Sequence, residues 1–441
     1  MRFEVRAVVD GARLGLLSGL GAKGASVETP ACLVYSHVGC VPHLTSDLLA
    51  SLADLPQCLY LPLPELAGHQ DILEKNGDGI SKFVGMPEYG TFVSQHDPMA
   101  PVPSGYNGHK FVSVWATGGR VQLTTARFLS LIEAMRPDCY VAMADILSDH
   151  KSIKPKFLQP GDHERTNVAD PVQTGESVVD GLASVTIADN KVNGLSKAST
   201  LESQPTTQQT RRAQDRTLQF LDECLALQAR SQALRDTSIL APVLGAGMAS
   251  DVIMFVRKLA IKPISGFALL GRQSWPDELL TAVVTELPYD KLRMVCGIGE
   301  PSAVLDCVRR GVDLFDGHYP QLATACGYAL TFYYPGLTAE PAQEVSTSEG
   351  DFSTYGINLN DKRYHSDFRP LVPGCTCCAC QAHSRAYLHH LMCAHELLAS
   401  TLLASHNVHH YMGFFAAIRK ALASGRLNHF HHALNACGLA D

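Results

Sequence analysis

The stretch that decides the fold is "LRMVCGIGEPSAVLDCVRRGVDLFDGHY", residues 292–319. Its two ends are apolar runs of strand length, and the segment between them repeats apolar residues at helical spacing. Pro301 stands where proline is favoured at the start of a helix, and Gly311 stands where glycine commonly ends one. Strand, helix and strand in so short a stretch predict one parallel βαβ unit.

Four further apolar runs of this kind lie at 110–119, 139–146, 238–247 and 264–271. A near-continuous apolar run is typical of a parallel strand whose two faces are both covered. Several βαβ units predict an α/β protein, and we expect a (β/α)8 barrel of the TIM type. A doubly wound open sheet is the alternative, because the pattern does not decide whether the sheet closes.

Four cysteines crowd the segment "GCTCCACQAH", residues 374–383. Cys375, Cys377 and Cys380 form a Cys-x-Cys-x-x-Cys pattern on a tight loop, which suits the tetrahedral coordination of Zn²⁺ by thiolates. The alternatives are an iron–sulfur cluster that also uses Cys378 and an accidental group of thiols. Spacing alone does not choose a fourth ligand among the histidines that follow, which are His383, His389, His390, His395, His406, His409 and His410.

The composition argues against a chain that binds nucleic acid alone. The formal net charge is −7 and the pI is near 6.2, whereas phosphate contacts need clustered Lys and Arg. Any nucleic-acid role would therefore be shared with a partner. The first 15 residues lack the apolar core of a signal peptide, and no apolar run reaches the ~20 residues of a membrane span, so we expect a cytoplasmic protein.

Residues 357–411, which contain the cysteine cluster, resemble the zinc-binding subdomain of the tRNA-guanine transglycosylase family. In that family the Cys-x-Cys-x-x-Cys pattern is followed, after 25 residues, by a histidine, which here is His406. The resemblance therefore implies one Zn²⁺ per chain, and its four ligands would be Cys375, Cys377, Cys380 and His406. A site closed by four protein ligands is structural rather than catalytic.

Three shorter segments also resemble family motifs: "GFALLG" (266–271), "CGIGEP" (296–301) and "RGVDLFD" (310–316). The resemblance implies a barrel with a zinc-binding subdomain near the C-terminus. It also implies base exchange at the tRNA wobble position, where an aspartate attacks the ribose C1′ of guanosine. Asp316 stands at the position of that nucleophile.

Other family motifs are altered in this sequence. "ATGGRV" (116–121) stands where we align the family's Asp-Ser-Gly-Gly-Phe-Gln motif, so Ala116 replaces a carboxylate and cannot move a proton. "LGAG" (244–247) lacks the amide of the Gln-Gly-Gly turn that recognises the base. Residues 317–330 replace a basic stretch suited to the anticodon loop, and Asp145 matches an aspartate that contacts guanine.

These losses resemble those of the family's non-catalytic, accessory member in eukaryotes. The resemblance implies a heterodimer with a catalytic queuine tRNA-ribosyltransferase subunit, which exchanges guanine for queuine at position 34 of tRNAs with GUN anticodons. This chain would then support tRNA seating and complex stability, with Asp316 vestigial. The resemblance further implies self-association when the chain is alone and peripheral association with the mitochondrial outer membrane.

Two alternatives compete with this interpretation. One is an active homodimeric transglycosylase that uses Asp316. The other is a barrel enzyme for a small molecule, with a pocket at the strand ends lined by His318, Asp145 and Asp316.

The sequence divides into four regions. We expect 1–147 and 214–356 to form the two parts of the barrel, and 357–430 to form the zinc-binding subdomain and C-terminal helices. Residues 148–213 are rich in Ser, Thr and Gln, and such a segment cannot bury enough apolar surface to fold, so we predict a disordered insertion. On the helix expected at 384–425, the candidate interface residues are Tyr387, His410, Tyr411 and Phe414.

Overall fold

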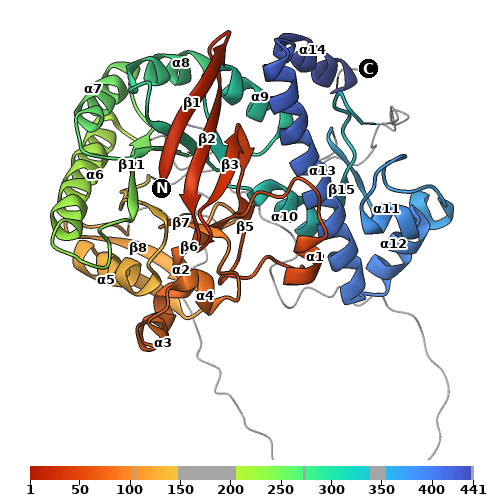
Figure 1. Cartoon of the computed structure of the whole chain (residues 1–441), viewed down its shortest axis with the longest axis horizontal. Coiled ribbons are helices and arrows are strands. Elements are labelled where there is room, and N and C mark those ends of the chain that lie inside the picture. The colour runs from red at the N-terminus through yellow and green to blue at the C-terminus, as the bar shows by residue number, and fades with distance from the viewer. Residues whose placement is uncertain (101, 103–105, 148–204, 272–274, 338–353, 439–441) are drawn as a thin grey trace, which may run out of the picture. The chain divides into compact units, whose positions relative to one another are not determined.

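A sheet of nine parallel strands forms the centre of the protein, in the order β4-β14-β13-β12-β11-β10-β7-β6-β5. This computed structural model describes residues 1–100, 102, 106–147, 205–271, 275–337 and 354–438. β4 and β5 stand at opposite ends of the order but are separated only by Leu33, so one stretch of chain joins both edges and the sheet is nearly closed (Figure 1). The (β/α)8 barrel prediction is confirmed, and the open-sheet alternative is wrong. The strands are β4 (Ala31–Cys32), β5 (Val34–Tyr35), β6 (Cys58–Pro62), β7 (Gly90–Ser94), β10 (Cys139–Val141), β11 (Ser238–Leu244), β12 (Gly266–Leu270), β13 (Leu292–Cys296) and β14 (Leu314–Phe315).

Helices alternate with these strands and cover their outer side. α9, predicted from its apolar spacing, begins at Pro301 and buries Val304, Leu305 and Val308. Gly311, with a φ of 86°, follows it and turns the chain into β14. The longer helices between strands are α5 (Thr125–Met135), α6 (Thr207–Gln228), α7 (Ala249–Ala260), α8 (Asp277–Glu286) and α9 (Pro301–Arg309), and the shorter ones are α1 (Ser46–Ala50), α2 (Leu63–Leu66), η1 (Ala67–His69), α3 (Gln70–Asn76) and α4 (Ile80–Phe83).

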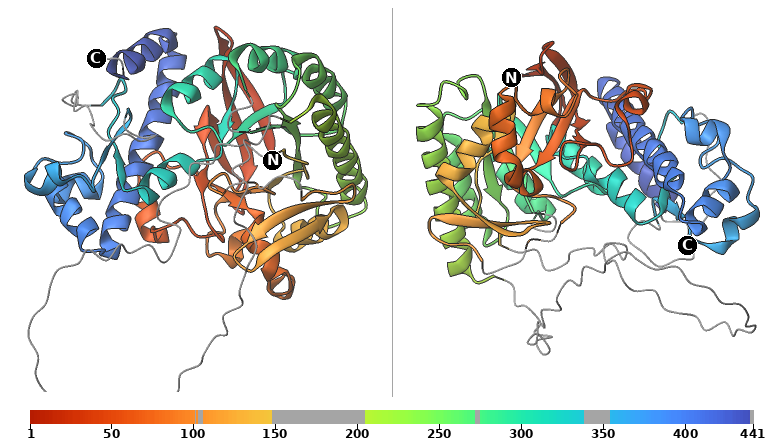
Figure 2. Two further views of the ribbon diagram at one scale, coloured as in Figure 1. Left: turned by 180° about the vertical axis from the view of Figure 1, so that it is seen from behind. Right: turned by 90° about the horizontal axis from the view of Figure 1, so that it is seen from below.

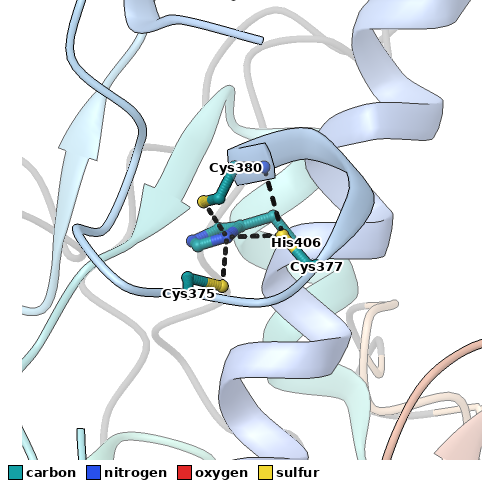
Figure 3. Close-up of side chains that lie close together, drawn as sticks. All are labelled: Cys375, Cys377, Cys380 and His406. Atoms are coloured by element: carbon teal, nitrogen blue, oxygen red, sulfur yellow. Dashed lines mark hydrogen bonds between the residues drawn. The ribbon is translucent and has the colours of Figure 1, made fainter. Parts of the chain in front are cut away.

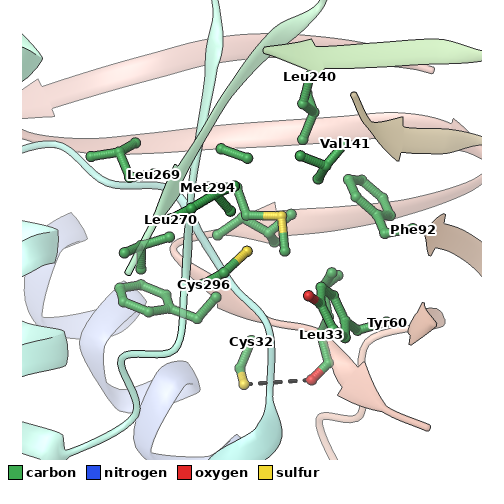
Figure 4. Packing of buried hydrophobic residues seen from close by; sticks show 14 of the residues in the cluster. Cys32, Leu33, Tyr60, Phe92, Val141, Leu240, Leu269, Leu270, Met294 and Cys296 are labelled. Atoms are coloured by element: carbon green, nitrogen blue, oxygen red, sulfur yellow. Dashed lines mark hydrogen bonds between the residues drawn. The ribbon is translucent and has the colours of Figure 1, made fainter. Parts of the chain in front are cut away.

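The barrel interior is filled by apolar side chains from several strands. Figure 4 shows Phe92, Leu240, Leu269 and Met294 in this region, and each is at most 1% exposed. Every residue of β12 and β13 is buried, because the helices cover the side chains that point away from the interior. Two buried faces explain why these strands are continuous apolar runs in the sequence.

An antiparallel sheet of three strands packs against the amino ends of the barrel strands. It consists of β1 (Arg2–Val9), β2 (Ala12–Leu20) and β3 (Ala25–Thr29). Arg13 of β2 forms a buried ion pair with Asp313, the residue before β14, at 2.9 Å. Its guanidinium also donates to the carbonyls of Tyr289 and Lys291, which precede β13. These contacts fix the N-terminal sheet to the barrel.

Two predicted segments differ from the structure. Residues 110–119 do not form a barrel strand, because β8 (Phe111–Ala116) pairs antiparallel with β9 (Gly119–Thr124) in a separate hairpin. The predicted insertion is also too long at its C-terminal end, since α6 begins at Thr207. Thr206 and Gln209 form a capping box that begins this helix, and the helix buries Thr210 and Ala213. The end of the polar segment therefore belongs to α6 and not to the insertion. The rest of the predicted insertion, 148–204, lies outside the described residues.

The chain after β14 builds a C-terminal subdomain around the long helix α13. α13 contacts α10, α11, α12 and β15, and it runs between the barrel and α11–α12 (Figure 2). β15 pairs antiparallel with β16, so the predicted boundary at 356/357 falls inside this small sheet. No described helix, α13 included, is both long and apolar enough to cross a membrane. The elements are α10 (His318–Ala325), β15 (Tyr328–Leu330), β16 (Gly356–Asn358), η2 (Lys362–Ser366), α11 (Cys378–Ala382), α12 (Arg385–Cys393), α13 (Leu397–Ala423) and α14 (Leu427–Gly438).

Candidate metal centre and barrel mouth

Three cysteines and one histidine converge in the C-terminal subdomain. Cys375 and Cys377 lie on the loop before α11, Cys380 lies within α11, and His406 lies on α13 (Figure 3). The Sγ atoms are 3.9, 3.4 and 3.3 Å from Nδ1 of His406, and the four donor atoms all lie within 4.8 Å of one another. Such a group can hold a metal ion. Tetrahedral coordination of zinc would place sulfur and nitrogen roughly 3.5 Å apart, which these distances approach.

His406 is oriented by a hydrogen bond on its far side. Its Nε2 lies 2.8 Å from the carbonyl oxygen of Leu330 in β15, and the side chain is fully buried. A carbonyl only accepts, so Nε2 carries the proton and donates it. In the neutral ring Nδ1 then presents its lone pair to the three sulfurs, which is the arrangement common to metal-binding histidines.

The neighbouring candidates have other partners. Cys378 is exposed and its Sγ lies 3.2 Å from Oγ of Ser405. His409 contacts the hydroxyl of Thr376, His410 the carbonyl of Phe332, and His389 the carbonyl of Leu359. The geometry therefore selects His406, a choice that spacing alone left open.

Asn407, next to His406, ties α13 to the elements that follow the barrel. Its Oδ1 accepts from the backbone N–H of Leu330 at 2.8 Å, and its Nδ2 donates to the carbonyl of Tyr328 and to Oγ1 of Thr324. The side chain is fully buried. The hydrogen bond of His406 to Leu330 and these contacts of Asn407 therefore fix the same turn of α13 against β15 and α10.

At the opposite end of α10 lies the barrel mouth, which we define as the residues following the carboxyl ends of the barrel strands. Asp316 follows β14 there and is fully buried. One carboxylate oxygen accepts from the backbone N–H of Gly297 at 2.6 Å, and the other lies 2.6 Å from Nδ1 of His318 and also accepts from its backbone N–H. Both oxygens are thus engaged within the protein.

Asp145, which follows β10, is enclosed in the same way. It is 1% exposed, accepts from Nδ2 of Asn107 at 2.7 Å and forms an ion pair with Arg216 of α6. A carboxylate that is already paired with a guanidinium is less available to a purine. Arg216 carried no signal in the sequence, because its contact depends on how α6 packs across the mouth.

Comparisons with known proteins agree with this geometry. Residues 197–436 match the family model described as "Queuine tRNA-ribosyltransferase". Two curated relatives named queuine tRNA-ribosyltransferase accessory subunit 2 are 37% identical in Danio rerio and 34% identical in Homo sapiens. The first alignment covers 98% of both chains and the second 97% of both. The chain belongs to the queuine tRNA-ribosyltransferase family.

The structure does not place the segment aligned with the family's catalytic-acid motif at the barrel mouth. Ala116 ends β8, in the hairpin outside the barrel sheet, and does not follow a barrel strand. The strand next to β6 in the barrel is β7, and the half-buried acid beyond it is Asp97. The hydroxyl of Tyr35 donates to both oxygens of Asp97 at 3.0 Å. Removal of its carboxyl group from water raises the pKa of Asp97. The hydrogen bonds from the backbone N–H of Met99 and from the Tyr35 hydroxyl lower it, but by less.

One small cavity lies at the carboxyl ends of β10, β11 and β12 among the described residues. It encloses about 20 Å³ between Ile146, Leu244 and Gly271. That is room for about one water molecule, whereas ligand sites are typically about 300–1,000 Å³. This cavity is not the pocket predicted for a small-molecule enzyme, because it is not lined by Asp145, Asp316 or His318, which are all buried.

Most of the predicted interface residues are buried within the chain. His410 and Tyr411 are each 1% exposed and Phe414 is fully buried, because α13 packs against several elements. Only Tyr387 of α12, at 38%, presents an exposed ring among the four. The predicted roles of His410, Tyr411 and Phe414 in an interface are therefore wrong, and Tyr387 keeps its prediction.

Proposed function

We propose that this chain is the non-catalytic, accessory subunit of a heterodimeric queuine tRNA-ribosyltransferase. In the proposed complex a catalytic paralogue exchanges guanine for queuine at position 34 of tRNAs with GUN anticodons. This chain supports the seating of the tRNA and the stability of the complex. The names of its family relatives support this role.

The observation that carries the proposal is that the carboxylate of Asp316 is buried and hydrogen-bonded within the chain. A nucleophilic carboxylate needs an oxygen that can approach the ribose carbon, yet both oxygens of Asp316 accept hydrogen bonds inside the protein. Asp145 is likewise bound to Arg216. In the described part of the mouth, neither the attacking group Asp316 nor the purine-contacting group Asp145 is therefore free to take part in exchange.

The proposal includes one structural Zn²⁺ per chain, held by Cys375, Cys377, Cys380 and His406. The donor set fits, since three sulfurs and one oriented imidazole nitrogen saturate a tetrahedral ion and leave no position for substrate. The ion would join α11 to α13 and thereby stabilise the subdomain.

The proposal also covers the cellular location of the complex and the self-association of this chain. We place the complex in the cytoplasm, with peripheral attachment to the mitochondrial outer membrane through the assembled complex. Without its partner the chain would self-associate, and the exposed ring of Tyr387 supports a contact through α12.

An exchange assay tests the role directly. The zinc-loaded chain, its catalytic paralogue and the mixture are incubated with labelled queuine and a tRNA with a GUN anticodon. The mixture should incorporate label and this chain alone should not. In the mixture, Asp316→Asn in this chain should leave incorporation unchanged within error, whereas loss of the paralogue's nucleophile should abolish it. Incorporation by this chain alone that Asp316→Asn abolishes would establish the active homodimer instead.

A further inference from the structure

A cysteine and a histidine on α12 form a second pair of chemically complementary side chains, separate from the metal centre. Cys393 is the last residue of α12 and is exposed, whereas His389, one turn earlier, is 6% exposed. The spacing of four residues places both on one face of the helix. Sγ of Cys393 lies 3.6 Å from Nε2 of His389.

The protein fixes the orientation of the His389 ring. Its Nδ1 lies 2.7 Å from the carbonyl oxygen of Leu359, which follows β16. Because a carbonyl only accepts, Nδ1 carries the proton, and the neutral ring directs the lone pair of Nε2 at the thiol. The ring of His365 packs edge-on against it, with centroids 6.4 Å apart. Nucleophile, base and a group that orients the base are the three parts of an activated thiol.

We propose that Cys393 is a nucleophilic thiol, activated by His389, which small peroxides oxidise to a sulfenic acid. The Sγ proton moves to Nε2 of His389, and the thiolate attacks one oxygen of hydrogen peroxide. The O–O bond breaks, the sulfur is oxidised, and the departing hydroxide takes the proton from the imidazolium to form water. The products are the sulfenic acid, water and neutral His389, so the histidine is ready for the next proton.

The position of the pair suits this chemistry. The positive charge that appears on His389 lies one turn before the C-terminal end of α12, and the helix dipole favours a cation near that end. Cys393 is exposed, so a peroxide reaches it without local unfolding. Burial excludes reagent from the thiols inside the barrel, such as Cys58 and Cys139, and raises their pKa as well.

Cys40 is an internal reference within the same chain. It is exposed like Cys393, and its backbone pairs with that of His37, but among the described residues its sulfur has no hydrogen bond to a histidine ring. His390, the exposed neighbour of His389, is a matched control because it lies on the same helix. A substitution of His389 by glutamine keeps a donor for the Leu359 carbonyl and removes the base.

The test measures oxidation one cysteine at a time. The full, zinc-loaded chain is treated with hydrogen peroxide at neutral pH, sulfenic acid is trapped with dimedone, and each peptide is quantified by mass spectrometry. Cys393 should be trapped at least about tenfold faster than Cys40, because a positioned base contributes that much or more. His389→Gln should remove this advantage and His390→Gln should retain it, with zinc content unchanged in both.

Two results would overturn the proposal. One is equal trapping of Cys393 and Cys40 in the unsubstituted chain, a comparison that needs no variant to fold. The other is undiminished trapping of Cys393 in a folded His389→Gln variant.

Discussion

Arg13 and Asp313 lie 300 residues apart in the sequence and form an ion pair in which both side chains are at most 2% exposed. The pair joins the first hairpin of the chain to the last barrel strand. Asp313 also accepts from the backbone N–H of Arg293, so the same carboxylate aligns β13 and β14. The N-terminal sheet is therefore held to the barrel by polar contacts shielded from water.

Removing one member of this pair should be strongly destabilising. Arg13→Met leaves the Asp313 carboxylate buried without its partner, and such losses typically cost about 3–5 kcal/mol. Urea unfolding followed by circular dichroism should show this decrease in the free energy of unfolding. The control is Arg6→Met, which breaks an exposed pair with Glu28 at 4.0 Å and should cost about 1 kcal/mol or less. Equal effects in the two variants would contradict the expectation.

The metal centre gives a second prediction. His406→Ala and Cys377→Ser should each lower the zinc content from one equivalent per chain towards zero and lower the melting temperature, because a closed site contributes folding free energy. His409→Ala and Cys378→Ser should retain the metal, since these side chains contact Thr376 and Ser405. Metal analysis together with thermal unfolding measures both effects. Full zinc retention in His406→Ala would show that another residue is the ligand.

The sequence pattern predicts the helices and strands whose formation depends on neighbouring residues in the chain. The βαβ stretch at 292–319, with Pro301 and Gly311 at the ends of its helix, folds as expected because apolar spacing and backbone preference agree there. The pattern at 110–119 does not distinguish the two structures, because a short apolar run occurs equally in a barrel strand and in a hairpin packed on one side. The cysteine pattern alone does not predict that His406 contacts the three sulfurs. That prediction depends on the family's spacing of 25 residues between the last cysteine and the histidine.

Contacts made between distant elements had no sequence signal. The pairing of Asp145 with Arg216 depends on α6, whose first residues were assigned to the insertion. Asp97 has no signal in the sequence, because what distinguishes it is its position after β7 and its hydrogen bond from Tyr35. Burial of His410 follows from the packing of α13 on several sides, which a helical pattern with aromatic and histidine residues does not reveal.

The buried thiols should make the fold sensitive to alkaline pH. Burial is the main cause that raises the pKa of Cys224 and of Cys307 from 9.0 to about 12. Between pH 9 and 12 the unfolded chain loses these protons and the folded chain keeps them, so the free energy of unfolding falls as pH rises. Each thiol should contribute about 1.4 kcal/mol per pH unit in that window. Melting temperatures of the unsubstituted chain and of Cys224→Ala across this range should differ in slope, and parallel curves would refute the assignment.

The last prediction concerns the guanidinium that closes the barrel mouth. Arg216→Ala leaves Asp145 buried with Asn107 as a partner but without a countercharge, so the fold should lose about 3–5 kcal/mol. Arg212→Ala, on the exposed side of α6, is the matched control and should change stability by less than about 0.5 kcal/mol. Adding Asp145→Asn to Arg216→Ala should recover part of the loss, because the buried charge is then gone. Denaturant unfolding compares the unsubstituted chain, the two single variants and the double variant. If the double variant is no more stable than Arg216→Ala, Arg216 acts by packing and not by neutralising Asp145.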